Sequence, residues 1–179
     1  AILSGDTQEF SRLVDSYKSV VFTVALRMMK NREEAEEVAQ DTFIKVYKSL
    51  LQFKGDSKLS TWIYRITYNT CLDRLKKNKK DLNKLAIDDI QGFEIKSVDD
   101  ALEGMVKSER AILVRKCIEK LPPKDAALMT LFYLEEKSLA ELGEILTMSE
   151  NSVKVGLFRA RGRNGIIVKQ YLEPETIEN

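Results

Sequence analysis

Basic and aromatic side chains interleave between Phe53 and Lys80, and together they have the chemistry to hold unpaired nucleic acid. Aromatic faces accept stacked bases, while cations follow a phosphate backbone. Lysines and arginines outnumber carboxylates in this stretch, where Asp73 lies among the cations. The residues predicted to contact unpaired DNA are Phe53, Lys54, Lys58, Tyr64, Arg65, Tyr68, Asn69, Arg74, Lys76 and Lys77.

The aromatic residues of this segment divide into two groups by their spacing. Trp62 and Ile66 lie one helical turn apart, which is more typical of a core than of a binding surface. We expect Tyr64, Tyr68 and Asn69 to be the exposed members.

A second candidate interface lies between Ser138 and Arg163 and has the outline of a helix-turn-helix. Ser138 and Glu141 form a capping box that opens a short helix, and Ser149 caps a longer one. One face of the longer helix is apolar, so the opposite face could enter a major groove. A core helix with a solvated basic face is the alternative. The residues predicted to contact duplex DNA are Ser149, Asn151, Ser152, Lys154, Val155, Phe158, Arg159 and Arg161.

An acidic cluster near Arg32 supplies the remaining candidate chemistry. Its members are Glu33, Glu34, Glu36, Glu37 and Asp41. Carboxylates in a first helical turn are favoured by the helix dipole, and a docking surface for a basic partner helix is the competing interpretation. Catalysis by paired carboxylates is disfavoured, because no nucleophile or metal-ligand arrangement accompanies the cluster.

The composition narrows the class of protein. The 179 residues include no histidine, which removes the commonest general base and the favoured zinc ligand, so we expect no enzymatic activity, no metal and no cofactor. The net charge is only +1, so binding to an acidic polymer requires local segregation of charge. Cys71 and Cys117 lie far apart, as is typical of a reducing cytoplasm, and the apolar run from Val20 to Leu26 is too short to span a bilayer.

The periodicity predicts an all-α fold of two small helical domains. A capping box at Asp6–Glu9, a cap at Asn31 and a start near Ser60 mark three helices, with a loop at Gln52–Ser60. Periodicity is lost after Asp81, resumes before Pro122–Pro123, and continues through a helix at about 124–134. The predicted parts are a domain at 1–80, an acidic flexible linker at 81–105, a domain at 106–172 and a tail at 173–179.

Two motifs, in this order, resemble one known family. Asn31–Phe43 (NREEAEEVAQDTF) and Leu59–Asn69 (LSTWIYRITYN), followed by Leu72-Asp73, are similar to region 2 of the extracytoplasmic-function sigma factors of bacterial RNA polymerase. The chain also resembles region 4 of that family, at Leu121-Pro122, Ser138–Ser149, Val153-Lys154 and Arg159–Arg161. The chain departs from the family pattern at Thr147, Val155-Gly156, Gly162 and Gly165.

The resemblance implies a transcription initiation factor that directs RNA polymerase core to promoters and assists DNA melting. Glu37, Gln40, Asp41 and Ile44 would dock on the clamp helices of the largest polymerase subunit. The loop at 52–60, with Tyr68 and Asn69, would capture a flipped base of the −10 element, and the helix-turn-helix would meet the −35 element. Further implied partners are the polymerase β flap and an anti-sigma factor, and the free chain is expected to be a cytoplasmic monomer without direct membrane insertion.

Two other functions fit the residues alone. A stand-alone helix-turn-helix regulator would bind duplex DNA without polymerase. A nuclease would use the acidic cluster with a divalent metal, and loss of cleavage in a Glu37→Ala variant would identify it.

Overall fold

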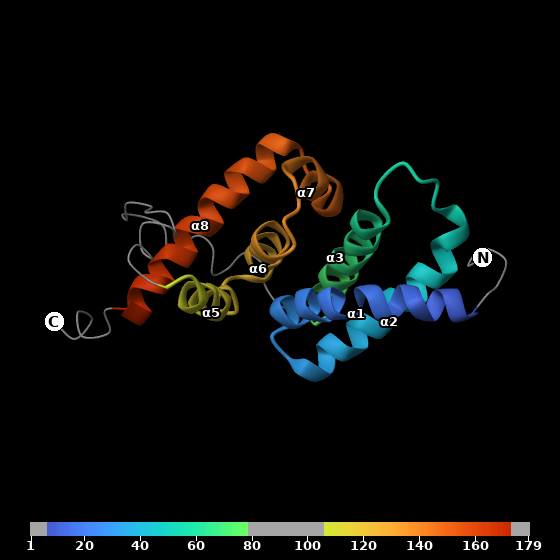
Figure 1. Cartoon of the computed structure of the whole chain (residues 1–179), viewed down its shortest axis with the longest axis horizontal. Helices are drawn as coiled ribbons and strands as arrows, with labels where there is room; N and C mark the ends of the chain where they lie inside the picture. Colours follow the sequence, from blue (N-terminus) through green and yellow to red (C-terminus); the bar gives the residue numbers. More distant parts are fainter. Residues whose placement is uncertain (1–6, 79–105, 173–179) are drawn as a thin grey trace.

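The computed structural model describes residues 7–78 and 106–172, and every regular element in these ranges is helical (Figure 1). The first domain contains α1 (Thr7–Met29), α2 (Arg32–Ser49), the 3-10 turn η2 (Leu50–Gln52) and α3 (Leu59–Lys77). The second contains α5 (Lys107–Ile118), α6 (Pro123–Met129), the π-helical turn η3 (Thr130–Leu134), α7 (Leu139–Leu146) and α8 (Glu150–Leu172). The predicted cap at Asp6, the linker at 81–105 and the tail at 173–179 lie outside the described residues.

The helix boundaries follow the local capping chemistry. Lys30 takes a left-handed conformation with φ of 59° and ends α1, and the Asn31 side chain then accepts a hydrogen bond from the Glu34 N–H at 3.0 Å. This confirms the predicted cap of α2. Pro123 occupies the first turn of α6, where its missing N–H removes no helical hydrogen bond. The helix predicted at about 124–134 is instead the short α6 followed by a π-helical turn.

The turn between α7 and α8 requires glycine at position 143. The Met148 N–H donates to the Gly143 carbonyl at 2.9 Å, and Thr147 is left-handed with φ of 55°. A Cβ on Gly143 would lie 2.8 Å from the Met148 carbonyl oxygen, which is too close for any side chain. Ser149 accepts from the Ser152 N–H at 3.1 Å and caps α8 as predicted. This geometry confirms the helix-turn-helix.

The two domains share one continuous apolar core. α1 packs against α6, and α3 packs against α7 (Figure 1). Buried side chains of both domains belong to a single cluster that runs from Leu13 to Val168. Cys71 and Cys117 are buried within it, and burial raises the pKa of Cys71 to about 12 and that of Cys117 to about 11. The domains are therefore closed against each other.

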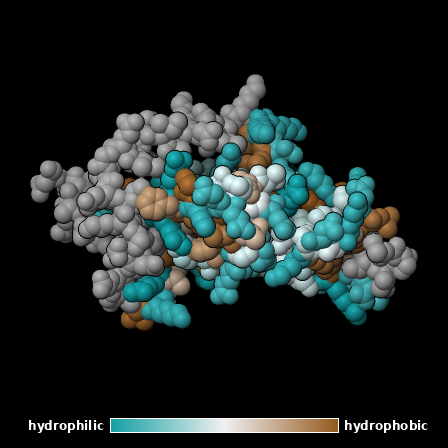
Figure 2. Space-filling model, turned by 90° about the horizontal axis from the view of Figure 1, so that it is seen from above, coloured by the Kyte–Doolittle hydropathy of each residue, from teal (hydrophilic) through white to brown (hydrophobic). Residues whose placement is uncertain are grey.

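Hydrophilic residues cover much of the face seen in Figure 2, and hydrophobic residues appear there in separate patches. Among the helices of residues 7–78 and 106–172, none combines the length and the apolar character needed to cross a membrane.

Candidate nucleic-acid interface

The recognition face of α8 is exposed as the sequence predicts. Val153, Leu157 and Ala160 are buried and pack the helix onto its own domain. The opposite side carries exposed residues, which are Ser149, Asn151, Ser152, Lys154, Val155, Phe158 and Arg159. Two of them are large and apolar, since Val155 is 42% exposed and Phe158 60% exposed. Apolar side chains between cations suit contact with thymine methyl groups in a major groove.

Arg161 lies away from this face, contrary to the prediction. It follows Leu157 by one turn, and its guanidinium stacks over the rings of Phe132 and Tyr133, 5.1 and 5.4 Å from their centroids. Cation–π contacts of this kind hold a charge inside a domain. The aromatic pair that captures it lies in η3, so the spacing along α8 could not reveal the contact.

Arg163 is also held within the second domain, because it forms an ion pair with Asp125 of α6, and both side chains are largely buried. Burial raises the pKa of Asp125, although the hydrogen bond and charge of Arg163 oppose the rise. Arg159 and Lys169 remain exposed on α8.

Gly156 lies on α8 where the helix approaches α6. A Cβ at this position would be 3.3 Å from the Leu128 side chain. Glycine at this position, which departs from the family pattern, therefore lies where α8 packs closely on α6. Gly162 and Gly165, the other departures on this helix, are buried.

The predicted surface for unpaired DNA is only partly exposed. Its open members are Lys54, Lys58, Arg65, Asn69, Lys76 and Lys77. Phe53 is half-buried, because its ring packs against Trp62 with centroids 4.9 Å apart. Trp62 and Ile66 are half-buried against the core, in line with their predicted place.

Tyr64 and Tyr68 are each only 5% exposed, so the prediction that they are exposed was wrong. The Lys137 ammonium lies 5.3 Å from the centre of the Tyr64 ring, and burial raises the pKa of Tyr64, with a further rise from the Glu135 charge. Burial likewise raises the pKa of Tyr68 to about 12, with contributions from Cys71 and Asp125. The second domain thus approaches both rings, and that contact could not be read from the spacing within α3.

Arg74 is paired with Glu37, although the sequence assigns these residues to two different partners. Their side chains form an ion pair between α3 and α2, and next to it the Asn78 amide donates to Glu34 at 2.7 Å. Glu37 keeps a 63% exposed side chain, whereas Arg74 is 22% exposed. The pair neutralises one cation of the predicted DNA surface.

The outer face of α2 carries an apolar stripe beside the predicted docking residues. Gln40, Asp41 and Ile44 are exposed as the docking assignment requires. Tyr47 is 54% exposed and Leu51 76% exposed. Sequence reasoning missed these two, although they follow Ile44 by three and seven residues, which is helical spacing. Exposed apolar side chains beside a carboxylate are typical of a protein-binding surface.

Two clusters of polar contacts join the domains. At one end of the contact, the buried Arg27 donates to Thr130 Oγ1 at 2.9 Å, and Lys30 donates to the Glu119 carbonyl. Burial lowers the pKa of Arg27 and of Lys30, and the Glu119 charge opposes both shifts. A cleft of about 490 Å³ lies here between α1 and the end of α5.

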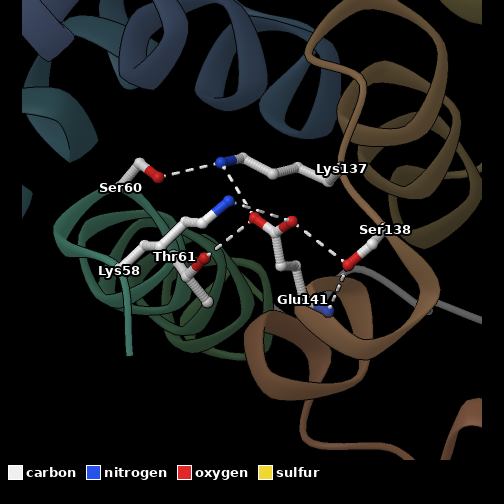
Figure 3. Close-up of polar contacts among 6 residues, drawn as sticks. All are labelled: Lys58, Ser60, Thr61, Lys137, Ser138 and Glu141. Carbon is white, nitrogen blue, oxygen red and sulfur yellow. Dashed lines mark hydrogen bonds and ion pairs between the residues drawn. The ribbon is translucent and has the colours of Figure 1, made fainter. Parts of the chain in front are cut away.

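The other cluster centres on Glu141 of α7 (Figure 3). Its carboxylate accepts hydrogen bonds from Thr61 Oγ1 at 3.3 Å and from Lys137 Nζ at 3.2 Å. Lys58 Nζ lies 3.7 Å from the other carboxylate oxygen. Lys137 also donates to Ser60 Oγ at 2.8 Å, so the start of α3 and the start of α7 are tied together.

Comparison with known proteins identifies the family. Residues 13–81 match sigma-70 region 2, and residues 98–163 match sigma-70 region 4. The chain is 35% identical over 166 residues to the ECF RNA polymerase sigma factor SigW of Bacillus subtilis, with 89% of each chain covered. The chain belongs to the extracytoplasmic-function sigma factors. It is therefore a transcription initiation factor that directs RNA polymerase to promoters, and the stand-alone regulator is not favoured.

Other relatives agree with this family. The RNA polymerase sigma-H factor of Pseudomonas aeruginosa is 29% identical over 163 residues, which cover 88% of this chain and 84% of the relative. Two solved structures share the fold. CnrH in complex with the cytosolic domain of CnrY has a TM-score of 0.63 and 19% identity, covering 97% of this chain and 94% of that one. RpoE in complex with the anti-sigma factor NepR from Bartonella quintana has a TM-score of 0.65 and 20% identity, covering 90% and 98%.

Proposed function

We propose that this sigma factor binds polymerase core through the outer face of α2 and reads a promoter with two separate surfaces. The division is 1–80 for region 2, 81–105 for the acidic linker, 106–172 for region 4 and 173–179 for the tail. It acts without catalysis of its own, in the cytoplasm, where polymerase works. The observation that carries the proposal is that both surfaces assigned to DNA expose cations, one along α3 and the loop before it and the other on the outer side of α8.

The docking surface consists of Glu37, Gln40, Asp41 and Ile44, extended by Tyr47 and Leu51. Its carboxylates and apolar side chains suit a basic, amphipathic partner such as the clamp helices of the largest polymerase subunit. Region 4 would contact the β flap.

The promoter contacts divide by the form of the DNA. The exposed face of α8 would meet the −35 element as duplex, with Lys154 and Arg159 on phosphates and Asn151 near base edges. The loop before α3, with Asn69, would hold a base flipped from the −10 element. Tyr64 and Tyr68 can take part only after the second domain moves away, because both are covered in the closed form.

An anti-sigma factor is the proposed regulator. CnrH and RpoE, which share the fold, were solved in complex with the cytosolic domain of CnrY and with the anti-sigma factor NepR. A ligand that binds the closed form better than the open one would keep the sigma factor from polymerase.

Reconstituted transcription tests the function. Bacterial core polymerase and this protein are combined on promoter fragments, and permanganate reports opened thymines. Protein-dependent opening is expected. Asp41→Ala should weaken core binding about tenfold with little change in the free energy of unfolding, because Asp41 is exposed. The matched control is Asp15→Ala, an exposed carboxylate on α1 that pairs with Lys18. Unchanged core binding by the Asp41 variant would refute the docking assignment.

A further inference from the structure

The carboxylate of Glu141 occupies a place built for an anion. The cation and hydroxyl donors around it come from two segments, the start of α3 with the residue before it and the two residues before α7 (Figure 3). Lys58 precedes α3 and leaves that 19-residue helix without a side-chain cap. The positive end of the α3 dipole, the Thr61 hydroxyl and the Lys58 ammonium therefore all face an oxyanion that another domain supplies.

The same place lies within the surface assigned to unpaired DNA. Lys58 is an exposed member of that surface, and Lys54 and Arg65 are exposed nearby in sequence. The Lys58 side chain is 73% exposed even with Glu141 beside it, so it can reach a phosphate that follows the strand. A DNA phosphate has the charge and the acceptor oxygens that the carboxylate now provides.

We propose that Lys58, Ser60 and Thr61 form a binding site for a backbone phosphate of the −10 strand, and that Glu141 occupies this site in the free protein. The proposal rests on the proposed promoter function of region 2. Glu141 acts as a latch. When its carboxylate leaves the site, the phosphate donors become available and the contact between the two domains is lost. The closed form and the form that holds unpaired DNA exclude each other.

Other contacts of the same closure support this exclusion. The Lys137 ammonium, which binds Glu141 and Ser60, also lies over the Tyr64 ring. Withdrawal of α7 would therefore uncover the phosphate donors and an aromatic face in one movement. The recognition face of α8 is exposed in the closed form and does not depend on this movement.

Glu141→Gln tests the proposal with little harm to α7. Glutamine also suits the third position of a capping box, so the cap with Ser138 can persist while the charge is removed. Binding is measured by fluorescence anisotropy of a short fluorescein-labelled single-stranded DNA, and domain opening by the radius of gyration from small-angle X-ray scattering. We expect about fivefold tighter DNA binding and a larger radius of gyration. The matched control is Glu144→Gln, an exposed carboxylate on the same helix, which should change neither.

A second change separates the phosphate site from opening alone. Lys58→Ala in the Glu141→Gln background should weaken DNA binding again and reduce its dependence on salt, while the radius of gyration stays large. The phosphate site is overturned if Glu141→Gln opens the protein without tighter DNA binding, or if Lys58→Ala in that background leaves DNA binding unchanged. In either case the alternative occupant of the site is an acidic protein segment. An unchanged radius of gyration in Glu141→Gln overturns the latch.

A second variant and a separate transcription assay complete the test. Should Glu141→Gln fail to fold, Lys137→Ala removes the hydrogen bonds to Ser60 and Glu141 from the second domain and leaves the three residues of the phosphate site unaltered, so a smaller gain in DNA binding is expected. No gain there overturns the proposal. Reconstituted transcription with the unaltered chain reports separately on the promoter function, so the two can fail independently.

Discussion

Several side chains that the sequence assigns to DNA or polymerase make contacts with other residues of the chain. Arg74 pairs with Glu37, and Arg161 stacks on two aromatic rings, so these two arginines reach DNA only by leaving a contact. The sequence correctly identified the caps at Asn31 and Ser149, because capping depends on neighbours within one turn. It could not identify the pairs, because each joins residues distant in sequence.

Two glycines of region 4 should respond very differently to alanine. In Gly143→Ala the new Cβ meets a backbone oxygen at 2.8 Å, and we expect a loss of about 2 kcal/mol in the free energy of unfolding, measured by urea denaturation. Gly156→Ala is the control, because its Cβ meets only the end of the Leu128 side chain at 3.3 Å and gains helix propensity. Equal effects of the two substitutions would contradict this account of the turn.

At the scale of helices, the sequence predicted the buried and exposed faces correctly where helical periodicity alone determines them. The buried stripe of Val153, Leu157 and Ala160 and the exposed residues opposite it on α8 are an example. The interruption of the predicted helix at 124–134 by a π-helical turn was missed, because hydrogen bonding of that kind has no signature in residue spacing. The outer stripe of α2 was recognised only in part.

Leu51 and Leu50 are neighbours that should separate binding from stability. Leu51 is 76% exposed, so Leu51→Ser should weaken binding to polymerase core about tenfold and change the free energy of unfolding by less than about 0.5 kcal/mol. Leu50 is 8% exposed, and Leu50→Ser should instead lower the stability. Core binding is measured by competition with a labelled sigma factor. Full affinity in the Leu51 variant would exclude this residue from the docking surface.

At the scale of the whole molecule, closure decides which predicted surfaces are available. The sequence predicted two helical domains and their order, and it missed their contact, because neither domain's own periodicity specifies a shared core. The burial of Tyr64 and Tyr68 follows the same pattern, since Lys137 of the second domain lies over the Tyr64 ring and the charge of Asp125 acts on Tyr68. The −35 face remains open, whereas the −10 face keeps its cations exposed and has Tyr64 and Tyr68 covered.

The closed form should open in acid through Glu141. Burial alone would raise the pKa of Glu141, but hydrogen bonds from Lys137 and Ser138 and the Lys137 charge lower it below the ordinary value of 4.5. A carboxylate with a lowered pKa favours the form in which it is bound at pH values above 4.5, and this contribution is lost as the pH falls through the lowered pKa. Lys58 and Lys137 are the charged groups that face Glu141.

The measurement is the radius of gyration as a function of pH. It should be constant near neutral pH and rise in acid below 4.5, and Glu141→Gln should remove the part of this rise that belongs to the latch. A pH profile that is identical in the two proteins would show that other carboxylates control closure.

The shared apolar core also gives closure a dependence on temperature. Separating α1 from α6 and α3 from α7 brings apolar surface into water, which raises the heat capacity of the open form. Hydrophobic association weakens on cooling, so a chilled sigma factor spends more of its time open than a warm one. Cooling would therefore uncover the surface for the −10 strand more often in the free protein.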